Sequence, residues 1–161
     1  MLMLTRFWMS NSSLTLLLTM GWGCSGNVSD PQWPDPVECQ GTVTWNGKPL
    51  PDAAVLFIPD ERTQGRGGSA LTDSDGFYTV NSRGKGGDII PGIVPGKYKV
   101  AFSRMINPDG TVWTPDEDNS SGPATVGARE GLPVKYSDPG RSKLIVTINE
   151  GGPTQDFVLK K

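Results

Sequence analysis

The stretch VECQGTVTWNGKPLPDAAVLFIP, residues 37–59, decides the fold of this chain. Polar residues in its first part alternate with five residues that share one face, Val37, Cys39, Gly41, Val43 and Trp45. A period of two is typical of a β-strand that is buried on one side only. Asn46 and Gly47 tolerate the positive φ angles of a tight turn, and the apolar run 54–58 predicts a second strand that ends at Pro59.

Five further segments have the composition of strands, and turn residues separate them. They are 67–72, 77–80, 97–103, 144–148 and 155–159. Because Asp73 to Gly76 predicts a turn, we expect the first two to form an antiparallel hairpin, with Phe77 or Tyr78 facing inward. The sequence therefore predicts an all-β domain, a seven-stranded antiparallel Greek-key sandwich of immunoglobulin-like type, and no helix.

Composition and charge narrow the class of protein. The 161 residues suffice for one domain and a targeting segment, and the 21 glycines and 14 prolines disfavour long helices. The net charge is −2, and basic residues are scattered among acidic ones, which argues against nucleic acid as a partner. The chain has no histidine, and most hydrolase and zinc mechanisms depend on that residue.

The N-terminus has the pattern of an export signal. A short segment with one cation, Arg6, precedes an apolar run over 14–20 that is too short to span a bilayer. Gly23-Cys24 then resembles the end of a lipobox, in which the cysteine is diacylated and becomes the new N-terminus. We therefore expect a signal peptide over 1–23, and a lipidated Cys24 with a proline-rich tether over 24–36.

This leader predicts a location in the bacterial cell envelope. We expect the protein to be exported and membrane-anchored, in the outer membrane or at the cell surface if the bacterium has two membranes. The alternative is a disulfide between Cys24 and Cys39 in a freely secreted protein, which an oxidising compartment permits. Cys39 shares the apolar face of the first predicted strand, which favours a small buried hydrophobic residue instead.

The turns and strand starts of this chain follow a familiar order. They are GTV at 41–43 with NGKPL at 46–50, AV at 54–55 with FIP at 57–59, TDSDGFY at 72–78, PGKYKV at 95–100, LPVKYSD at 132–138 and FVL at 157–159. In this order and spacing, residues 37–161 resemble the carboxypeptidase regulatory-like domain, a transthyretin-like sandwich common in short bacterial lipoproteins. The resemblance implies a transthyretin-like fold and does not imply an activity.

Three motifs invite a chemical interpretation, and each is better explained as structure. Asp73 to Gly76 resembles the start of a calcium loop, but the strand that follows offers no further ligands. The glycine-rich segments 62–68 and 83–87 lack the ending of a phosphate loop and are interpreted as mobile connections. Without histidine, lysine would have to be the base for the candidate nucleophiles, which are Ser69, Ser103 and Ser142.

Segment 105–131 departs from alternation and is long for a connection in a sandwich. It carries Trp113 among proline, aspartate, asparagine and glycine, and an aromatic ring in such a loop can stack on a sugar or dock on a protein. Trp113 is therefore the candidate binding residue. The other interpretation is that its ring folds back over an open edge of the sandwich.

These expectations favour a membrane-anchored envelope lipoprotein that displays a non-catalytic β-sandwich in a structural, adhesion or assembly role. We expect no enzyme activity, metal or cofactor. The predicted partners are the membrane, through the lipid, and a protein or glycan of the envelope. The alternative is a module that binds a carbohydrate or another small ligand through loop 105–131, which would need a second exposed aromatic residue near Trp113.

Overall fold

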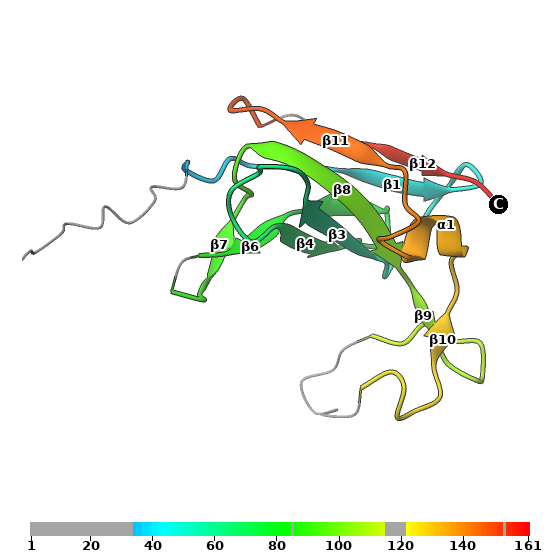
Figure 1. Cartoon of the computed structure of the whole chain (residues 1–161). Helices are drawn as coiled ribbons and strands as arrows, with labels where there is room; N and C mark the ends of the chain where they lie inside the picture. The colour runs from blue at the N-terminus through cyan, green and yellow to red at the C-terminus, as the bar shows by residue number, and fades with distance from the viewer. Residues whose placement is uncertain (1–33, 85, 115–121, 153) are drawn as a thin grey trace, which may run out of the picture. The chain divides into compact units, whose positions relative to one another are not determined.

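The computed structural model describes residues 34–84, 86–114, 122–152 and 154–161. The predicted signal peptide, Cys24 and most of the predicted tether lie outside the described residues. The described residues belong to one unit of the chain, whose regular structure is almost entirely β-strand (Figure 1). No helix in this part of the chain has the length and apolar composition needed to span a membrane.

One sheet is assembled around β1 (Gln40–Trp45). The turn at Asn46 and Gly47, with φ angles of 50° and 79°, folds the chain back into β2 (Lys48–Pro49). β5 (Phe77–Thr79) pairs antiparallel with the first half of β1. β12 (Phe157–Leu159) pairs parallel with its second half, so that β1 has partners along both edges.

The second sheet has the strand order β11-β8-β3-β4-β6-β7, and all its pairs are antiparallel (Figure 1). Its strands are β3 (Ala54–Pro59), β4 (Gly68–Leu71), β6 (Asn81–Arg83), β7 (Ile89–Pro91), β8 (Gly96–Ser103) and β11 (Ile145–Ile148). β3 lies between β8 and β4, which makes it an interior strand. An interior strand can be apolar on both faces, as the run 54–58 is.

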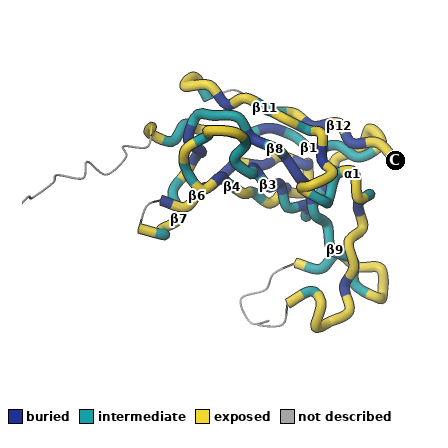
Figure 2. Tube along the Cα trace, in the orientation of Figure 1, coloured by how far each residue is buried: buried dark blue, intermediate teal, exposed yellow. Residues whose placement is uncertain are grey.

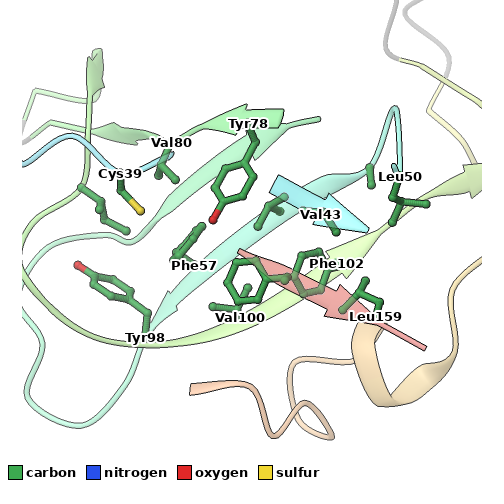
Figure 3. Packing of buried hydrophobic residues seen from close by; sticks show 14 of the residues in the cluster. Cys39, Val43, Leu50, Phe57, Tyr78, Val80, Tyr98, Val100, Phe102 and Leu159 are labelled. Carbon is green, nitrogen blue, oxygen red and sulfur yellow. The ribbon is translucent and has the colours of Figure 1, made fainter. Parts of the chain in front are cut away.

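The two sheets share one hydrophobic core (Figure 3). Phe57 of β3 and Phe102 of β8 lie 6.4 Å and 5.1 Å, between ring centres, from Phe157 of β12. The hydroxyls of Tyr78 and Tyr98 each donate a hydrogen bond of 2.6 Å to a backbone oxygen. The buried tyrosine hydroxyls therefore keep hydrogen-bond partners. Burial of the apolar area of each ring stabilises the folded state by about 2 kcal/mol.

The burial pattern confirms the predicted orientation of the early strands (Figure 2). Cys39, Gly41 and Val43 are buried, and the alternating Gln40 and Thr42 are more exposed. Tyr78 is 1% exposed whereas Phe77 is 38% exposed, so Tyr78 is the aromatic residue that faces inward. Cys39 is a free, buried cysteine, as expected for a small hydrophobic residue.

The predicted hairpin between 67–72 and 77–80 is wrong. β4 pairs with β3 and β6, whereas β5 lies in the other sheet and pairs with β1. Thr72, which follows β4, explains why the chain crosses to the other sheet here. Its hydroxyl donates a hydrogen bond to Leu50 O and accepts one from Ala53 N, which ties the end of β4 to the loop before β3. Asp73 to Gly76 is a turn, but it carries the chain from one sheet to the other.

Three further expectations need correction. The described residues contain twelve strands, since the short β2, β6, β7, β9 and β10 join those expected. The pairing of β1 with β12 is parallel, because the chain reaches β12 after leaving β11 in the other sheet. One helical turn, α1 (Val134–Ser137), follows Pro133, whose fixed φ of −58° suits a helix start.

Candidate functional site

The predicted binding loop forms an arm, residues 105–114 and 122–130, that projects from the two sheets (Figure 1). Its base is the antiparallel pair β9 (Met105–Ile106) and β10 (Arg129–Glu130). The Glu130 carboxylate accepts hydrogen bonds from the Ser103 hydroxyl at 2.7 Å and from the backbone N–H of Arg104 at 3.0 Å. The arm is thus fastened to the end of β8.

Trp113 lies on this arm and is half-buried. Its backbone N–H donates to Met105 O at 2.8 Å, and the preceding Val112 bridges to Ile106. Its indole Nε1 is buried and has no hydrogen-bond partner among the described residues. A depression of about 340 Å³ lies beside β9 and β10, lined by Ile106, Pro108, Arg129 and Glu130, and Trp113 is not part of its wall.

The three candidate nucleophiles are not brought together. Ser103 donates to Glu130 at the base of the arm. Ser142 is buried before β11 and donates to Val100 O. Ser69 is exposed on β4, in the other half of the six-stranded sheet. Each hydroxyl that has a partner therefore serves to join neighbouring segments.

The candidate calcium loop is held as a turn by its own first carboxylate. Asp73 Oδ1 accepts hydrogen bonds of 2.9 Å from the backbone N–H groups of Asp75 and Phe77. Gly76 has a φ of 73°, and a Cβ there would lie 2.4 Å from Val43 O. Among the described residues, no group of acidic, cysteine or histidine side chains is arranged to hold a metal ion.

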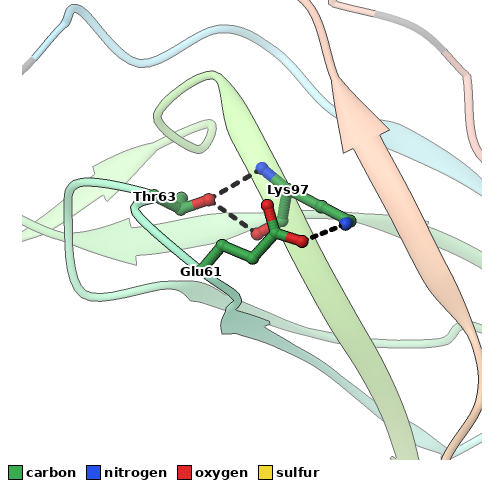
Figure 4. A network of polar contacts seen from close by, with 3 residues as sticks. All are labelled: Glu61, Thr63 and Lys97. Atoms are coloured by element: carbon green, nitrogen blue, oxygen red, sulfur yellow. Dashed lines mark hydrogen bonds and ion pairs between the residues drawn. The ribbon is translucent and has the colours of Figure 1, made fainter.

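Other polar groups join the end of β3 to β8 (Figure 4). The Thr63 hydroxyl donates to Lys97 O and accepts from Lys97 N, both at 2.8 Å. Glu61 forms an ion pair with the Lys97 ammonium and raises the pKa of that lysine. Because both charged groups are exposed, solvent screens their attraction.

Burial raises the pKa values of three acid groups of the core. Desolvation raises the pKa of the Cys39 thiol to about 11 and that of the Tyr98 hydroxyl to about 12. Desolvation also raises the pKa of Tyr78, with smaller effects from Cys39 and Asp156. All three groups are therefore neutral near pH 7 and act as packing and hydrogen-bonding groups.

A depression larger than the one beside β9 and β10 lies on the outer face of the six-stranded sheet, and we call it the outer groove. It has a volume of about 680 Å³ and extends over β3, β4 and β6 to the start of β7. Its wall includes Leu56, Ile58, Ser69, Leu71, Asn81 and Ile89. Ligand sites of this size are typically apolar with a few polar groups, which is the composition of this wall.

Two arginines line the outer groove where it meets a smaller cavity of about 150 Å³. Arg66 precedes β4 and Arg83 ends β6, so strand pairing brings the two side chains to the same end of the groove. The Arg83 guanidinium donates to Gly87 O at 3.1 Å, and its remaining N–H groups have no partner among the described residues. The smaller cavity is also lined by Asp35, Ser82 and Tyr98.

The sequence contains a signal for the floor of the outer groove, which lies in the composition of β3. The run Ala53 to Ile58 is apolar at every position, and an interior strand of this kind has two apolar faces. Only one face of β3 contributes to the core, through Val55 and Phe57. Leu56 and Ile58 must therefore lie on the other face, which is the floor of the groove.

Comparison with known proteins gives one distant likeness. No protein-family model matches the sequence, and no curated protein matches it. The chain is similar to the crystal structure of a DUF3823 family protein from Parabacteroides merdae, with 14% sequence identity and a TM-score of 0.34. The match covers 80% of this chain and 46% of that one, so the chain spans about half the length of the protein it matches.

Proposed function

We propose that this chain is an exported bacterial lipoprotein, anchored through Cys24, whose β-domain binds or organises envelope components and catalyses no reaction. The leader over 1–23 and the cysteine at its end support export and lipidation. The tether that follows contains prolines, which hold a chain extended and would keep the domain clear of the membrane. Binding to nucleic acid is not part of this role.

The observation that carries the non-catalytic role is how the polar side chains of the domain are used. Asp73 closes a turn, Thr72 ties two loops, and Glu130 fastens the arm. Asp156 accepts two hydrogen bonds of 2.8 Å from Thr42 and so holds the start of β12 beside β1. These groups support a rigid scaffold, and the surface that remains for recognition is the outer groove and the arm.

The finer fold belongs to the same proposal. The seven predicted strands correspond to β1, β3, β4, β5, β8, β11 and β12, and this set is the frame of a transthyretin-like, carboxypeptidase regulatory-like sandwich. The short strands β2, β6, β7, β9 and β10 are then additions to the frame. Amide hydrogen exchange tests this, because the frame should open only in global unfolding. Equally slow exchange in β6 and β7 would overturn it.

The experiment for the anchored role is intact mass and detergent partitioning of the full chain, expressed with its own leader in a bacterium. We expect the wild type to carry a diacylglyceryl or triacyl mass and to enter the detergent phase. A Cys24→Ser variant should lose both properties. If both proteins are unmodified and soluble, the chain is not a lipoprotein. The alternative is then a disulfide between Cys24 and Cys39, which the intact mass after alkylation tests.

A second candidate is carbohydrate or small-ligand binding through the arm. The buried, unpartnered Nε1 of Trp113 favours it, because a ligand acceptor at that nitrogen would supply the missing hydrogen bond. Titration of the full chain with soluble envelope glycans, followed by tryptophan fluorescence, tests it. A change that disappears in Trp113→Phe supports the arm as the site, and an unchanged spectrum at every glycan concentration counts against it.

A further inference from the structure

Both sheets expose hydrophobic side chains, Phe77 and Val158 among them on the first sheet, and some of those of the six-stranded sheet line a depression. The outward residues of β1 include Thr42 and Thr44, which are polar. The outward residues of the six-stranded sheet over β3, β4 and β7 include the polar Ser69 and several aliphatic side chains, of which Leu71 and Ile89 are 50% and 72% exposed. Exposed aliphatic side chains that gather in one depression usually mark a binding surface. The outer groove therefore needs an explanation that the fold itself does not supply.

Strand pairing sets the form of this surface. Leu56 pairs with Ser69, Ser69 with Asn81, and Asn81 with Pro91, so one row of side chains crosses four strands. Three spacings between strands are roughly 14 Å, the length of about four residues of extended chain. The groove is thus long enough to take a short extended segment.

The charge of the groove is one-sided. Arg66 and Arg83 line it, and no acidic residue among those that the structure describes does, although the chain as a whole has more acidic than basic residues. Neither arginine forms an ion pair among the described residues, even though Asp35 lines the adjoining cavity. A guanidinium presents planar donors that match a carboxylate, which makes arginine the preferred side chain for that group.

We propose that the outer groove binds an extended, acidic and aliphatic segment of a partner protein. Its aliphatic side chains cover Leu56, Leu71 and Ile89, and its carboxylates accept hydrogen bonds from Arg66 and Arg83. The proposal rests on the proposed function in one respect: an exported, membrane-anchored protein would meet this partner in the cell envelope. Binding itself is measured on the purified chain, so a failure of lipidation and a failure of binding are separate results.

Two other occupants fit the surface less well. A sugar would need an exposed aromatic face, and the one aromatic residue in the lining, Phe57, is 2% exposed and belongs to the core. An anionic lipid surface would satisfy the arginines, but the aliphatic residues line a depression, which a flat bilayer does not fill. Both are outcomes that the experiment distinguishes.

The experiment is selection from a random peptide library on phage against the full chain, purified as the host produces it. We expect enrichment of peptides in which Asp or Glu adjoins Val, Ile or Leu. Anisotropy of a labelled selected peptide then gives the affinity. Arg66→Gln and Arg83→Gln should each weaken binding about tenfold, the value of one charge-assisted hydrogen bond. Leu71→Ser should also weaken it.

Arg129→Gln is the matched control, because this exposed arginine lies on the arm, away from the groove. Its affinity for the selected peptide should equal that of the wild type. Circular dichroism shows whether each variant is folded, and Leu71→Ser and the arginine variants change only exposed side chains. Added salt should weaken binding, since it screens exposed charges.

Four results would overturn the proposal. They are no enrichment, enrichment of peptides without acidic residues, groove arginine variants that bind as tightly as the wild type, and loss of affinity in Arg129→Gln. Vesicles of phosphatidylglycerol, with phosphatidylcholine vesicles as the reference, test the lipid alternative. Arginine-dependent binding to the anionic vesicles without peptide selection would replace the peptide with a membrane surface.

Discussion

Gly41 determines how closely the C-terminal strand can approach β1. A Cβ at this position would lie 2.0 Å from the backbone oxygen of Gln155, which also accepts the Tyr78 hydroxyl. We therefore expect Gly41→Ala to lower the free energy of unfolding by at least about 2 kcal/mol, because backbone cannot yield as a side chain does. Urea unfolding of the full chain measures this change.

Gly151→Ala is the control for that substitution, since a Cβ there meets nothing within 4 Å. Its unfolding midpoint should match that of the wild type. Equal stability of Gly41→Ala and the wild type would show that β12 does not pack against β1 at this point.

The buried thiol of Cys39 leads us to expect that the free energy of unfolding falls at alkaline pH. Burial raises its thiol pKa from 9.0 to about 11, so the folded state favours the neutral thiol. The resulting stabilisation is complete below pH 9, declines as the pH rises from 9 to 11, and amounts to on the order of 2 kcal/mol. In a Cys24→Ser background, urea unfolding at pH 8 and pH 10 should show the decline.

Cys39→Ala in the same background should flatten that pH dependence, while the buried tyrosines still destabilise the fold at higher pH. Reaction of Cys39 with a thiol reagent at pH 8 should be slow in the folded chain and fast in urea. Rapid modification of the folded chain would contradict the burial.

Strands with a clear pattern of apolar residues could be predicted from the sequence. The strands with which they pair could not. The alternation of residues 37–45 and the apolar run 54–58 specify strands because each determines which faces are buried. Pairing depends on what lies opposite, which is why β5 pairs with β1 and not with β4. The strands β6 and β7 escaped prediction because they are three residues long and flank a glycine-rich turn.

The turn between β4 and β5 supports a prediction of its own. Asp73→Ala removes the acceptor for the N–H groups of Asp75 and Phe77, and we expect a loss of about 1 to 2 kcal/mol in unfolding free energy. Asp75→Ala is the control and should cost less than half as much. Millimolar calcium should leave the melting temperature of the wild type unchanged, and a rise abolished in Asp73→Ala would indicate a metal site instead.

In the domain as a whole, the parts that sequence patterns reveal are those that build the core. Core side chains repeat with the period of their strand, so Cys39 and Val43 could be assigned to one face, whereas the choice between Phe77 and Tyr78 stayed open. The arginines of the outer groove could not be foreseen, because Arg66 and Arg83 lie in segments without periodicity and are brought to one end of the groove by the pairing of β4 with β6. Trp113 could be found as an unusual residue, but its half-buried place on the arm depends on local pairing.

The separation of arm and core leads to the last prediction. The residues of the core cluster come mainly from both sheets and the segment around α1, and none comes from the described parts of the arm, 105–114 and 122–130. Replacing 107–128 by Asn-Gly keeps the pairing of Ile106 with Arg129 and should change the unfolding midpoint little. Phe157→Ala, which empties the centre of the core, should cost about 3 to 5 kcal/mol.

The armless chain also separates the two candidate binding surfaces. If the outer groove is the site, the armless chain should bind the selected acidic peptide as tightly as the wild type, while Arg83→Gln should not. If recognition depends on the arm, the armless chain should fold and fail to bind. An armless chain as unstable as Phe157→Ala would instead show that the arm supports the core, contrary to the arrangement of its contacts.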